Sequence, residues 1–264
     1  MEPVYILQHM EELSWHLAKQ GQTVVNQRDG SCDRVAVIVE PRQHPMFETV
    51  VRTVMNYLGD GWNLHVFTAP DNVAWVAKQL PRWNITVTPL SKYNLTIDEY
   101  SMLLMSEAFW DMIREQHVLL FQTDCVLFRH GMNAWIEDGY DYVGANYYNP
   151  RHVAHSIGGI QGGLSLRRRD AMLDCIRRVS MDDVHAYRRW RGMEPLCIGL
   201  DSYVIPEDIF FTHACEMLQK RVPTVEKRRE FSIEADYHPR ALGHHGLRFP
   251  YLTREQQQEL LTDA

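Results

Sequence analysis

A run of mostly hydrophobic residues covers positions 116–128, and it contains one acidic residue, Asp124. An apolar run of this kind is typical of a strand that is buried on both faces, as in a parallel sheet. Ligands of open α/β sheets bind beyond the carboxyl ends of such strands. Asp124 is therefore a candidate ligand-binding or metal-binding residue. The alternative is that it only begins a turn, which is the more common role of an isolated aspartate at a strand end.

The chain before this run alternates between two patterns. Continuous apolar stretches predict strands, and apolar residues at helical spacing predict helices that pack on one side. The expected elements are a strand at 34–39, a helix from Pro45 to Leu58, a strand at 62–67, a helix at 72–80, a strand at 85–90 and a long helix at 97–115. Such an alternation predicts a mostly parallel sheet with helices on both of its faces.

The residues that precede the first strand follow a different pattern. Residues 3–20 carry apolar side chains at helical spacing, and residues 21–33 form a polar stretch that contains glycine, asparagine and aspartate. We therefore expect an additional N-terminal helix and a linker at 1–33, with the core of the fold beginning after them.

The second half of the chain is richer in glycine and aromatic residues. A short strand is expected at 140–147, and the segment 157–172 predicts a glycine-rich turn, a short strand and the start of a helix. Within that segment, Gly162, Gly163 and Ser165 are candidate ligand-binding residues, because glycine lets the backbone approach a ligand closely. Glycine is equally common in tight turns, which is the alternative.

Three consecutive arginines, Arg167 to Arg169, follow these glycines. Such a run is able to bind a phosphate group, but a run of like charges more often forms a solvated surface. We therefore expect these side chains to be exposed to solvent.

Polar residues follow the first two predicted strands. Glu40 and Arg42 come after the first strand, and Asp71 comes after the second. They either border a ligand crevice or form an exposed turn and a helix cap, and both interpretations explain polar residues at these positions. The chain has neither a GxGxxG sequence after the first strand nor a P-loop, which disfavours a dinucleotide-binding or P-loop protein.

Two further pairs of residues carry potential chemistry. Glu207 and Asp208 follow Pro206 at a predicted helix start, where carboxylates usually interact with the helix dipole. Adjacent carboxylates also repel each other, which raises one pKa and prepares a general base. His244 and His245 lie between glycines in a predicted C-terminal loop, where either ring is free to turn toward a metal ion.

Composition limits the classes of function. The chain has 264 residues, 45% of them hydrophobic, which suits one large soluble domain. Its net charge of -7 argues against a general nucleic-acid binder. The five cysteines are widely spaced and odd in number, so we expect reduced thiols. No signal-peptide pattern or long apolar run occurs, and we therefore expect a cytoplasmic protein without a membrane span.

The order of these features resembles the GT-A fold of glycosyltransferases that use sugar nucleotides. The chain is most similar to an uncharacterised glycosyltransferase-like family of fungi, bacteria and large DNA viruses. The shared features are an early βαβ half, a strand that ends in an acidic signature, the Gly162–Arg167 segment, the Glu207-Asp208 pair before a helix and a late Gly-x-His sequence. The resemblance implies a GT-A-like domain at 34–251, with a nucleotide-binding half at 34–130, an acceptor half at 131–251 and a tail at 252–264.

The resemblance also implies a divalent metal site. In the GT-A fold, an Asp-x-Asp signature binds a metal ion that bridges the diphosphate of the sugar donor. Here Asp124 matches the second aspartate, and Gln122 replaces the first, where it would contact the ribose or a metal-bound water. The late histidine of the family matches His245 best, with His244 as the near alternative. Such ligands predict Mn²⁺ or Mg²⁺.

The remaining candidates receive roles from the same resemblance. Glu40, Arg42 and Asp71 would border the nucleotide, and the glycine-rich segment would face the sugar or the acceptor. Either Glu207 or Asp208 would take the proton of the acceptor hydroxyl. The expected sugar donor is a nucleoside-diphosphate sugar, with a UDP-sugar favoured, and the acceptor is open among glycans, proteins and small molecules.

Two other classes of function stay open at this point. A sugar-phosphate nucleotidyltransferase has a similar alternation of elements, but it usually carries a glycine-rich basic loop after the first strand, and this chain has none. A non-catalytic protein that binds carbohydrate or protein would explain the imperfect acidic signature. Hydrolysis of a sugar nucleotide in the presence of Mn²⁺ would distinguish an enzyme from such a binding protein.

Overall fold

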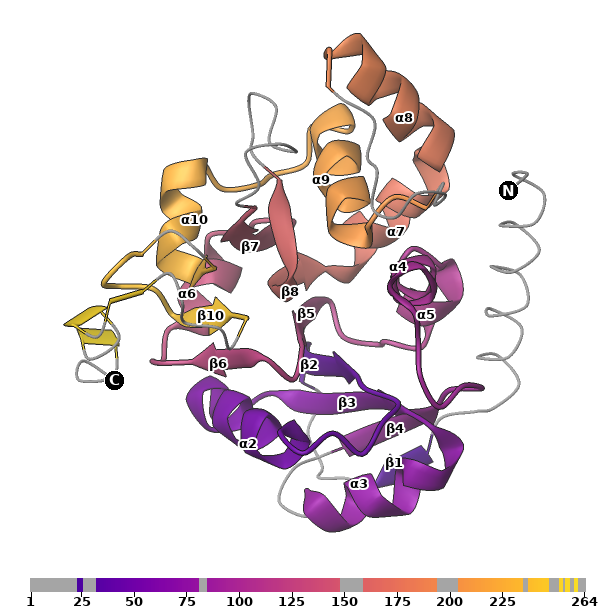
Figure 1. Cartoon of the computed structure of the whole chain (residues 1–264), viewed down its shortest axis with the longest axis vertical. Coiled ribbons are helices and arrows are strands. Elements are labelled where there is room, and N and C mark those ends of the chain that lie inside the picture. Colours follow the sequence, from indigo (N-terminus) through magenta and orange to yellow (C-terminus); the bar gives the residue numbers. More distant parts are fainter. Residues whose placement is uncertain are drawn as a thin grey trace.

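In the computed structural model, a sheet of seven strands runs through the part of the chain that the structure describes (Figure 1). The described residues are 23–25, 32–80, 85–147, 159–193, 204–234, 237–246, 252–253, 255–256 and 259–260. In spatial order the strands are β1 (Thr23–Val25), β4 (Ile85–Pro89), β3 (Asn63–Thr68), β2 (Arg34–Val39), β5 (His117–Phe121), β8 (Ile160–Arg168) and β7 (Tyr142–Asn146).

Most strands of this sheet point in one direction. Strands β4, β3, β2 and β5 pair in parallel, β8 is antiparallel to β5, and β7 is antiparallel to β8. Strand β7 therefore has the same direction as β5, and only β1 and β8 oppose the other strands. The predicted α/β fold with a mostly parallel central sheet is confirmed.

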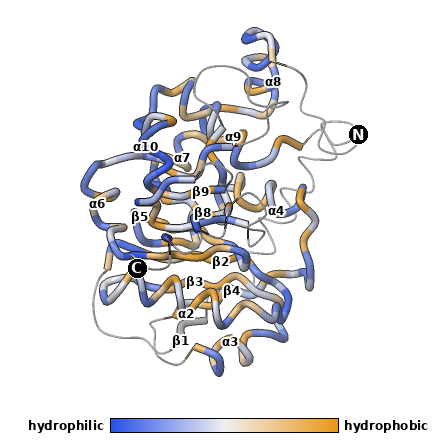
Figure 2. The backbone as a smooth tube through the Cα atoms, turned by 60° about the vertical axis from the view of Figure 1, so that its left-hand side comes forward, coloured by the Kyte–Doolittle hydropathy of each residue, from blue (hydrophilic) through white to orange (hydrophobic). Residues whose placement is uncertain are grey.

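Helices cover both faces of the sheet. They are α2 (Phe47–Leu58), α3 (Val73–Gln79), α4 (Ile97–Leu104), α5 (Glu107–Asp111), α6 (Met132–Glu137), α7 (Arg169–Arg178), α8 (Met181–Trp190), α9 (Glu207–Met217) and α10 (Val225–Phe231), with a short 3-10 helix η1 at Pro70–Asn72. Val35 and Val37 of β2 belong to one hydrophobic cluster with buried residues of α4, α5, α7 and α9. Ala36 and Ile38 belong to another, with buried residues of α2, α3 and α6. Figure 2 accordingly shows the central strands as the most hydrophobic part of the chain. The result is a three-layer sandwich, because successive strand residues point to opposite faces.

The hydrophobic run at 116–128 is divided between two sheets. Its first part forms β5, and after a turn its last part forms β6 (Cys125–Leu127) in a three-stranded sheet with β10 (Gly243–His245) and β9 (Ser232–Ile233). Strand β10 lies between the other two, antiparallel to β6 and parallel to β9. The turn that holds Asp124 therefore lies just beyond the carboxyl end of β5, as the sequence predicts.

Three predicted elements are wrong in detail. The long helix at 97–115 is two helices, because the Ser106 side chain accepts a hydrogen bond from the Phe109 amide and starts α5. Gly162 and Gly163 of the predicted glycine-rich turn lie inside β8 instead, while residues 157–158 of that segment lie outside the described residues. The two histidines are not in a loop but in β10, which pairs with strands on both sides.

The N-terminal region is described only in part. The predicted helix at 3–20 lies outside the described residues. Within the predicted linker, Thr23–Val25 form β1, which lies at the edge of the sheet and pairs with β4. None of the described helices is long and apolar enough to cross a membrane.

Candidate functional site

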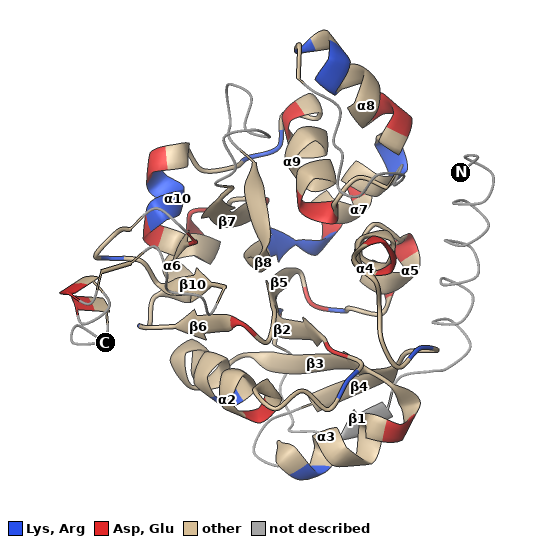
Figure 3. Cartoon of the chain, in the orientation of Figure 1, with Lys and Arg blue, Asp and Glu red and all other residues tan. Residues whose placement is uncertain are grey.

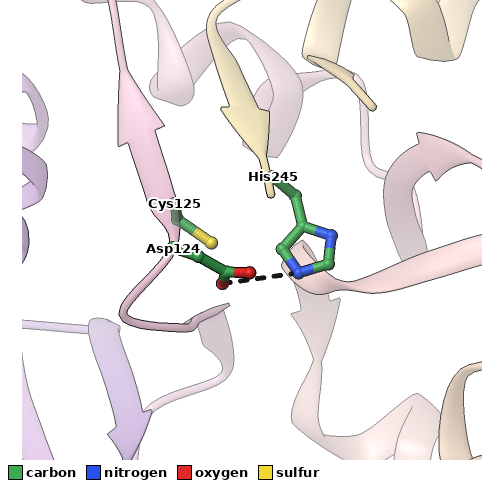
Figure 4. Close-up of side chains that lie close together, drawn as sticks. All are labelled: Asp124, Cys125 and His245. Carbon is green, nitrogen blue, oxygen red and sulfur yellow. Dashed lines mark ion pairs between the residues drawn. The ribbon is translucent and has the colours of Figure 1, made fainter. Parts of the chain in front are cut away.

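Asp124 and His245 meet at the junction of the two sheets (Figure 4). The Asp124 Oδ1 atom lies 3.6 Å from Nε2 of His245. The pairing of β10 with β6 places His245 opposite Cys125, and the Gly246 amide donates a hydrogen bond to the Asp124 carbonyl at 3.0 Å. The strand register and this backbone bond therefore bring together two residues that are 121 positions apart in the numbering of the chain.

Gln122 adds an oxygen atom to the same group. Its Oε1 lies 3.2 Å from His245 Nε2. Burial lowers the pKa of His245, although the charge of Asp124 raises it, so the ring is neutral at neutral pH. A carboxylate, a neutral imidazole and an amide oxygen thus converge, and this set of ligand atoms suits Mn²⁺ or Mg²⁺. The residues fit the divalent ion that the resemblance predicts.

Cys125 lies within ligand distance of Asp124 and His245 but has a structural role. The potential ligand atoms of the three residues lie within 4.8 Å of one another. The Cys125 thiol, however, donates a hydrogen bond to the Gly163 carbonyl at 2.9 Å and accepts one from the Gln122 amide. Burial raises the pKa of this thiol well above its usual value, so it stays protonated. Its contacts join the turn after β5 to β8.

The structure distinguishes the two neighbouring histidines by position. His244 is 1% exposed, and burial lowers its pKa to about 4. Because side chains alternate along a strand, His244 points away from the face of β10 on which His245 meets Asp124. Geometry therefore favours His245 as the metal-binding residue.

Gly162 and Gly163 make room for functional side chains. A Cβ atom on Gly163 would collide with the His245 ring, and one on Gly162 would collide with the carboxylate of Glu207. Gly163 thus lets β8 approach β10, and Gly162 lets β8 approach α9. They connect the Asp124–His245 group to the carboxylates at the start of α9.

Glu207 forms a buried ion pair with Arg167. The guanidinium donates from Nη1 to Oε2 at 2.7 Å and from Nη2 to Oε1 at 3.2 Å, and it lies over the rings of Tyr142 and Phe211. Figure 3 shows the arginines of β8 beside the acidic start of α9. The predicted exposure of the arginine run is wrong for Arg167, which is completely buried, because its carboxylate partner compensates its charge.

Asp208, the other member of the predicted pair, is not held by an arginine. Its Oδ1 accepts a hydrogen bond from the Ile209 amide at 2.8 Å, and its Oδ2 accepts one from the Gly162 amide at 3.4 Å. Burial and the charge of Glu207 raise the pKa of Asp208 to about 7. A carboxyl group with this pKa gains and loses a proton near neutral pH.

Ser165 and Asp71 each form hydrogen bonds with other side chains of the protein. Ser165 is completely buried, and its hydroxyl accepts a hydrogen bond from Arg167 Nε and donates one to the Gly162 carbonyl. It supports the Arg167–Glu207 ion pair. Asp71 is exposed, accepts a hydrogen bond from the Tyr93 hydroxyl and is not among the residues that line the cleft described next.

A cleft of about 510 Å³ opens beside Asp124. Its lining includes Glu40, Arg42, His44, Tyr100, Gln122 and Asp124. Glu40 is 4% exposed and accepts hydrogen bonds from both the backbone amide and the guanidinium of Arg42, so it fixes the arginine at the end of β2. The guanidinium side chain remains 54% exposed. The sequence prediction that Glu40 and Arg42 border a crevice agrees with this geometry.

Two residues near the site were missed in the sequence. Tyr100 of α4 interacts with Gln122 and lies within the electrostatic reach of Glu207, so it stands between the cleft and the buried ion pair. Glu234 follows β9, and burial together with the charge of Asp124 raises its pKa to about 7. The only signal for Glu234 is an acidic residue directly after the short apolar stretch of residues 231–233.

Comparisons with known proteins give a family and a fold. A family described as Protein of unknown function (DUF5672) matches residues 84–245, which is more than half of the chain. No curated protein matches the sequence. Among solved structures, the apo form of mouse xyloside xylosyltransferase 1 is similar, with a TM-score of 0.57 and 9% sequence identity, and the match covers 83% of this chain and 99% of that one. At this identity the similarity concerns the fold alone, which is a GT-A-like glycosyltransferase fold.

Proposed function

The chain belongs to the DUF5672 family of proteins of unknown function, and we propose that it is a glycosyltransferase. It would move a sugar from a nucleoside-diphosphate sugar to a hydroxyl group of an acceptor. The observation that carries this proposal is the convergence of Gln122, Asp124 and His245 at the edge of a cleft, within a GT-A-like fold.

The cleft suits the nucleotide part of such a donor. Its volume of about 510 Å³ lies in the range of small-molecule sites, and it opens at the carboxyl ends of β2 and β5. The exposed guanidinium of Arg42 would bind an acidic or carbonyl group of the nucleotide, because Glu40 already holds it in place. We favour a UDP-sugar as the donor.

Asp124, His245 and Gln122 would hold a divalent cation, Mn²⁺ or Mg²⁺. Such an ion, when bound, supplies positive charge that offsets the negative charge on the departing nucleoside diphosphate. The residues themselves orient this region. Gly163 gives the His245 ring its place against β8, and Cys125 fixes the turn that carries Asp124.

Asp208 would act as the general base. It takes the proton of the acceptor hydroxyl while the hydroxyl oxygen forms a bond to the anomeric carbon and the bond from that carbon to the diphosphate breaks. Glu207 is less suited to this role, because its two oxygens already accept hydrogen bonds from Arg167. The ion pair instead keeps the start of α9 against β8 and presents Asp208 next to Gly162.

The same proposal divides the chain into functional parts. Residues 34–130 would form the nucleotide-binding half and residues 131–251 the acceptor half, with 1–33 and 252–264 outside the domain. Asp124 lies in the first half and Asp208 in the second, so the reaction would take place where β5 and β8 adjoin.

Release of nucleoside diphosphate tests this function directly. The protein is incubated with UDP-sugars and Mn²⁺, and UDP is measured with and without simple glycoside acceptors. We expect metal-dependent release in the wild type and a loss of at least ~10²-fold in Asp208→Asn. If UDP-, GDP-, dTDP- and CMP-sugars all stay intact with every acceptor class, the protein is not a transferase and the binding-protein alternative replaces it.

A further inference from the structure

Glu234 stands beside His245 at the end of two paired strands. Strand β9 is parallel to β10, with Ser232 opposite Gly243 and Ile233 opposite His244. The next residue along each strand is Glu234 on one and His245 on the other. The strand pairing therefore places Glu234 next to His245, although its carboxylate is not among the ligand atoms of Asp124, Cys125 and His245 that lie within 4.8 Å of one another.

One oxygen of the Glu234 carboxylate receives no hydrogen bond from the described residues. This atom, Oε2, is buried. Burial and the negative charge of Asp124 both raise the pKa of this carboxyl group. A buried carboxylate without a partner costs free energy, and two neighbouring carboxylates repel each other. A cation bound between Glu234 and Asp124 would remove both penalties at once.

The turn after β5 carries one carboxylate fewer than an Asp-x-Asp signature would give it. An Asp-x-Asp signature would contribute two carboxylates from the turn after β5, but here Gln122 supplies only a neutral amide oxygen. Without a bound nucleotide, Asp124 would be the one carboxylate among Gln122, Asp124 and His245 to offset the charge of a divalent cation. Glu234 would restore the second negative charge from a different strand.

We propose that Glu234 helps to hold the divalent cation, and that it supplies the negative charge that Gln122 does not. This inference rests on the metal site in the proposed function. Glu234 is also close enough to Tyr147 to act on it electrostatically, as Asp208 does.

Titration of Mn²⁺ tests this role without any turnover. Free Mn²⁺ is followed by electron paramagnetic resonance, with and without UDP, for the wild type, Glu234→Gln, Asp124→Asn and a control, Glu226→Gln. Glu226 lies on α10 with a side chain that is 80% exposed, so its change removes the same charge outside the site. We expect Glu234→Gln to weaken Mn²⁺ binding by at least ~10-fold and Glu226→Gln to leave it unchanged.

The midpoint of thermal unfolding without metal separates a metal-binding role from a structural one. Glu234→Gln keeps the shape of the side chain and removes the repulsion with Asp124, so its metal-free midpoint should equal or exceed that of the wild type. A lower metal-free midpoint with unchanged Mn²⁺ affinity would overturn the inference.

The variants also distinguish this inference from the proposed function. If Asp124→Asn abolishes Mn²⁺ binding while Glu234→Gln binds like the wild type, Glu234 has no part in the site and the transferase proposal stands. If the wild type binds no Mn²⁺ either alone or with UDP, both the role of Glu234 and the metal site are wrong.

Discussion

Arg167 and Glu207 form a buried, bidentate ion pair that joins β8 to the first turn of α9. Their side chains are 0% and 6% exposed. The pair determines which of the two adjacent carboxylates remains available for chemistry, since it occupies both oxygens of Glu207 and leaves Asp208 beside Gly162. A structural interaction thus separates the roles of two residues that the sequence does not separate.

The first prediction concerns the stability that this pair provides. Glu207→Gln leaves the Arg167 charge buried without its anionic partner, and breaking a buried pair in this way costs about 3–5 kcal/mol. The free energy of unfolding is measured with a chemical denaturant. As a control, Glu107→Gln removes a half-exposed partner of Arg177 and should change the free energy of unfolding far less, because solvent screens an exposed ion pair. Equal effects of the two changes would contradict the special role of the buried pair.

The second prediction is a pH dependence of turnover. Asp208 must be ionised to accept a proton, and its pKa is about 7. Turnover should therefore rise with pH and level off above about pH 7. In Asp208→Asn, turnover should fall by at least ~10² above pH 7, and the difference from the wild type should shrink as the pH falls, while the affinity for the sugar donor stays nearly unchanged. If Asp208→Asn and Glu207→Gln both keep full turnover, the pair is only a helix start.

The third prediction is that Asp208 lowers stability at alkaline pH. Its pKa is higher in the folded protein than in the unfolded chain, so between about pH 4 and pH 7 the folded state binds more protons. The stabilising contribution of the protonated form is complete at low pH and is lost as the pH rises through 7. Asp208→Asn should therefore unfold at a higher temperature than the wild type at pH 8, and the difference should vanish near pH 4. A lower midpoint at pH 8 would show that the carboxylate is stabilising.

The fourth prediction uses the close approach of β8 and β10. A methyl group at Gly163 would collide with the His245 ring, so Gly163→Ala should displace the imidazole from Asp124. We expect weaker Mn²⁺ binding by titration calorimetry, comparable with the effect of His245→Ala. His244→Ala serves as the comparison within the same strand and should leave Mn²⁺ affinity unchanged. If His244→Ala has the larger effect, the assignment of the metal-binding histidine must be reversed.

The elements that the sequence predicts well are those whose signal is local. The apolar stretch at 34–39 and the helix that ends at Leu58 were recognisable because each buries its side chains with a regular period. Asp124 was recognisable because a polar residue interrupts a buried stretch. These signals need no knowledge of which strand lies next to which.

The remaining features depend on contacts between distant residues. Arg167 and Glu207 are 40 positions apart, and neither shows in the sequence that its charge has a buried partner. The choice between His244 and His245 depends on the register of β10 against β6, since a shift of one residue would exchange the faces on which their side chains lie. Glu234 was missed for the same reason, because only the pairing of β9 with β10 brings it beside His245.

The last prediction tests the ligand class in one experiment. A nucleoside-diphosphate sugar should stabilise the protein when Mn²⁺ is present, because the sugar nucleotide would bind the folded state at Arg42 and at the cation held by Asp124. A ligand at about 100 times its dissociation constant adds ~2.7 kcal/mol to the free energy of unfolding. For a chain of this length each kcal/mol moves the unfolding midpoint by roughly 2–4 °C, so the correct donor should raise it by about 5–10 °C.

The measurement is a thermal-shift panel of UDP-, GDP-, dTDP- and CMP-sugars, with and without Mn²⁺, and with NAD as a nucleotide that should have no effect. We expect the largest shift for a UDP-sugar with Mn²⁺ and a much smaller one for the same sugar with Asp124→Asn. A shift that persists unchanged in Asp124→Asn would locate nucleotide binding away from this centre. If the protein unfolds cooperatively and no sugar nucleotide shifts its unfolding midpoint, the transferase proposal is wrong, because a folded transferase has to bind its sugar donor.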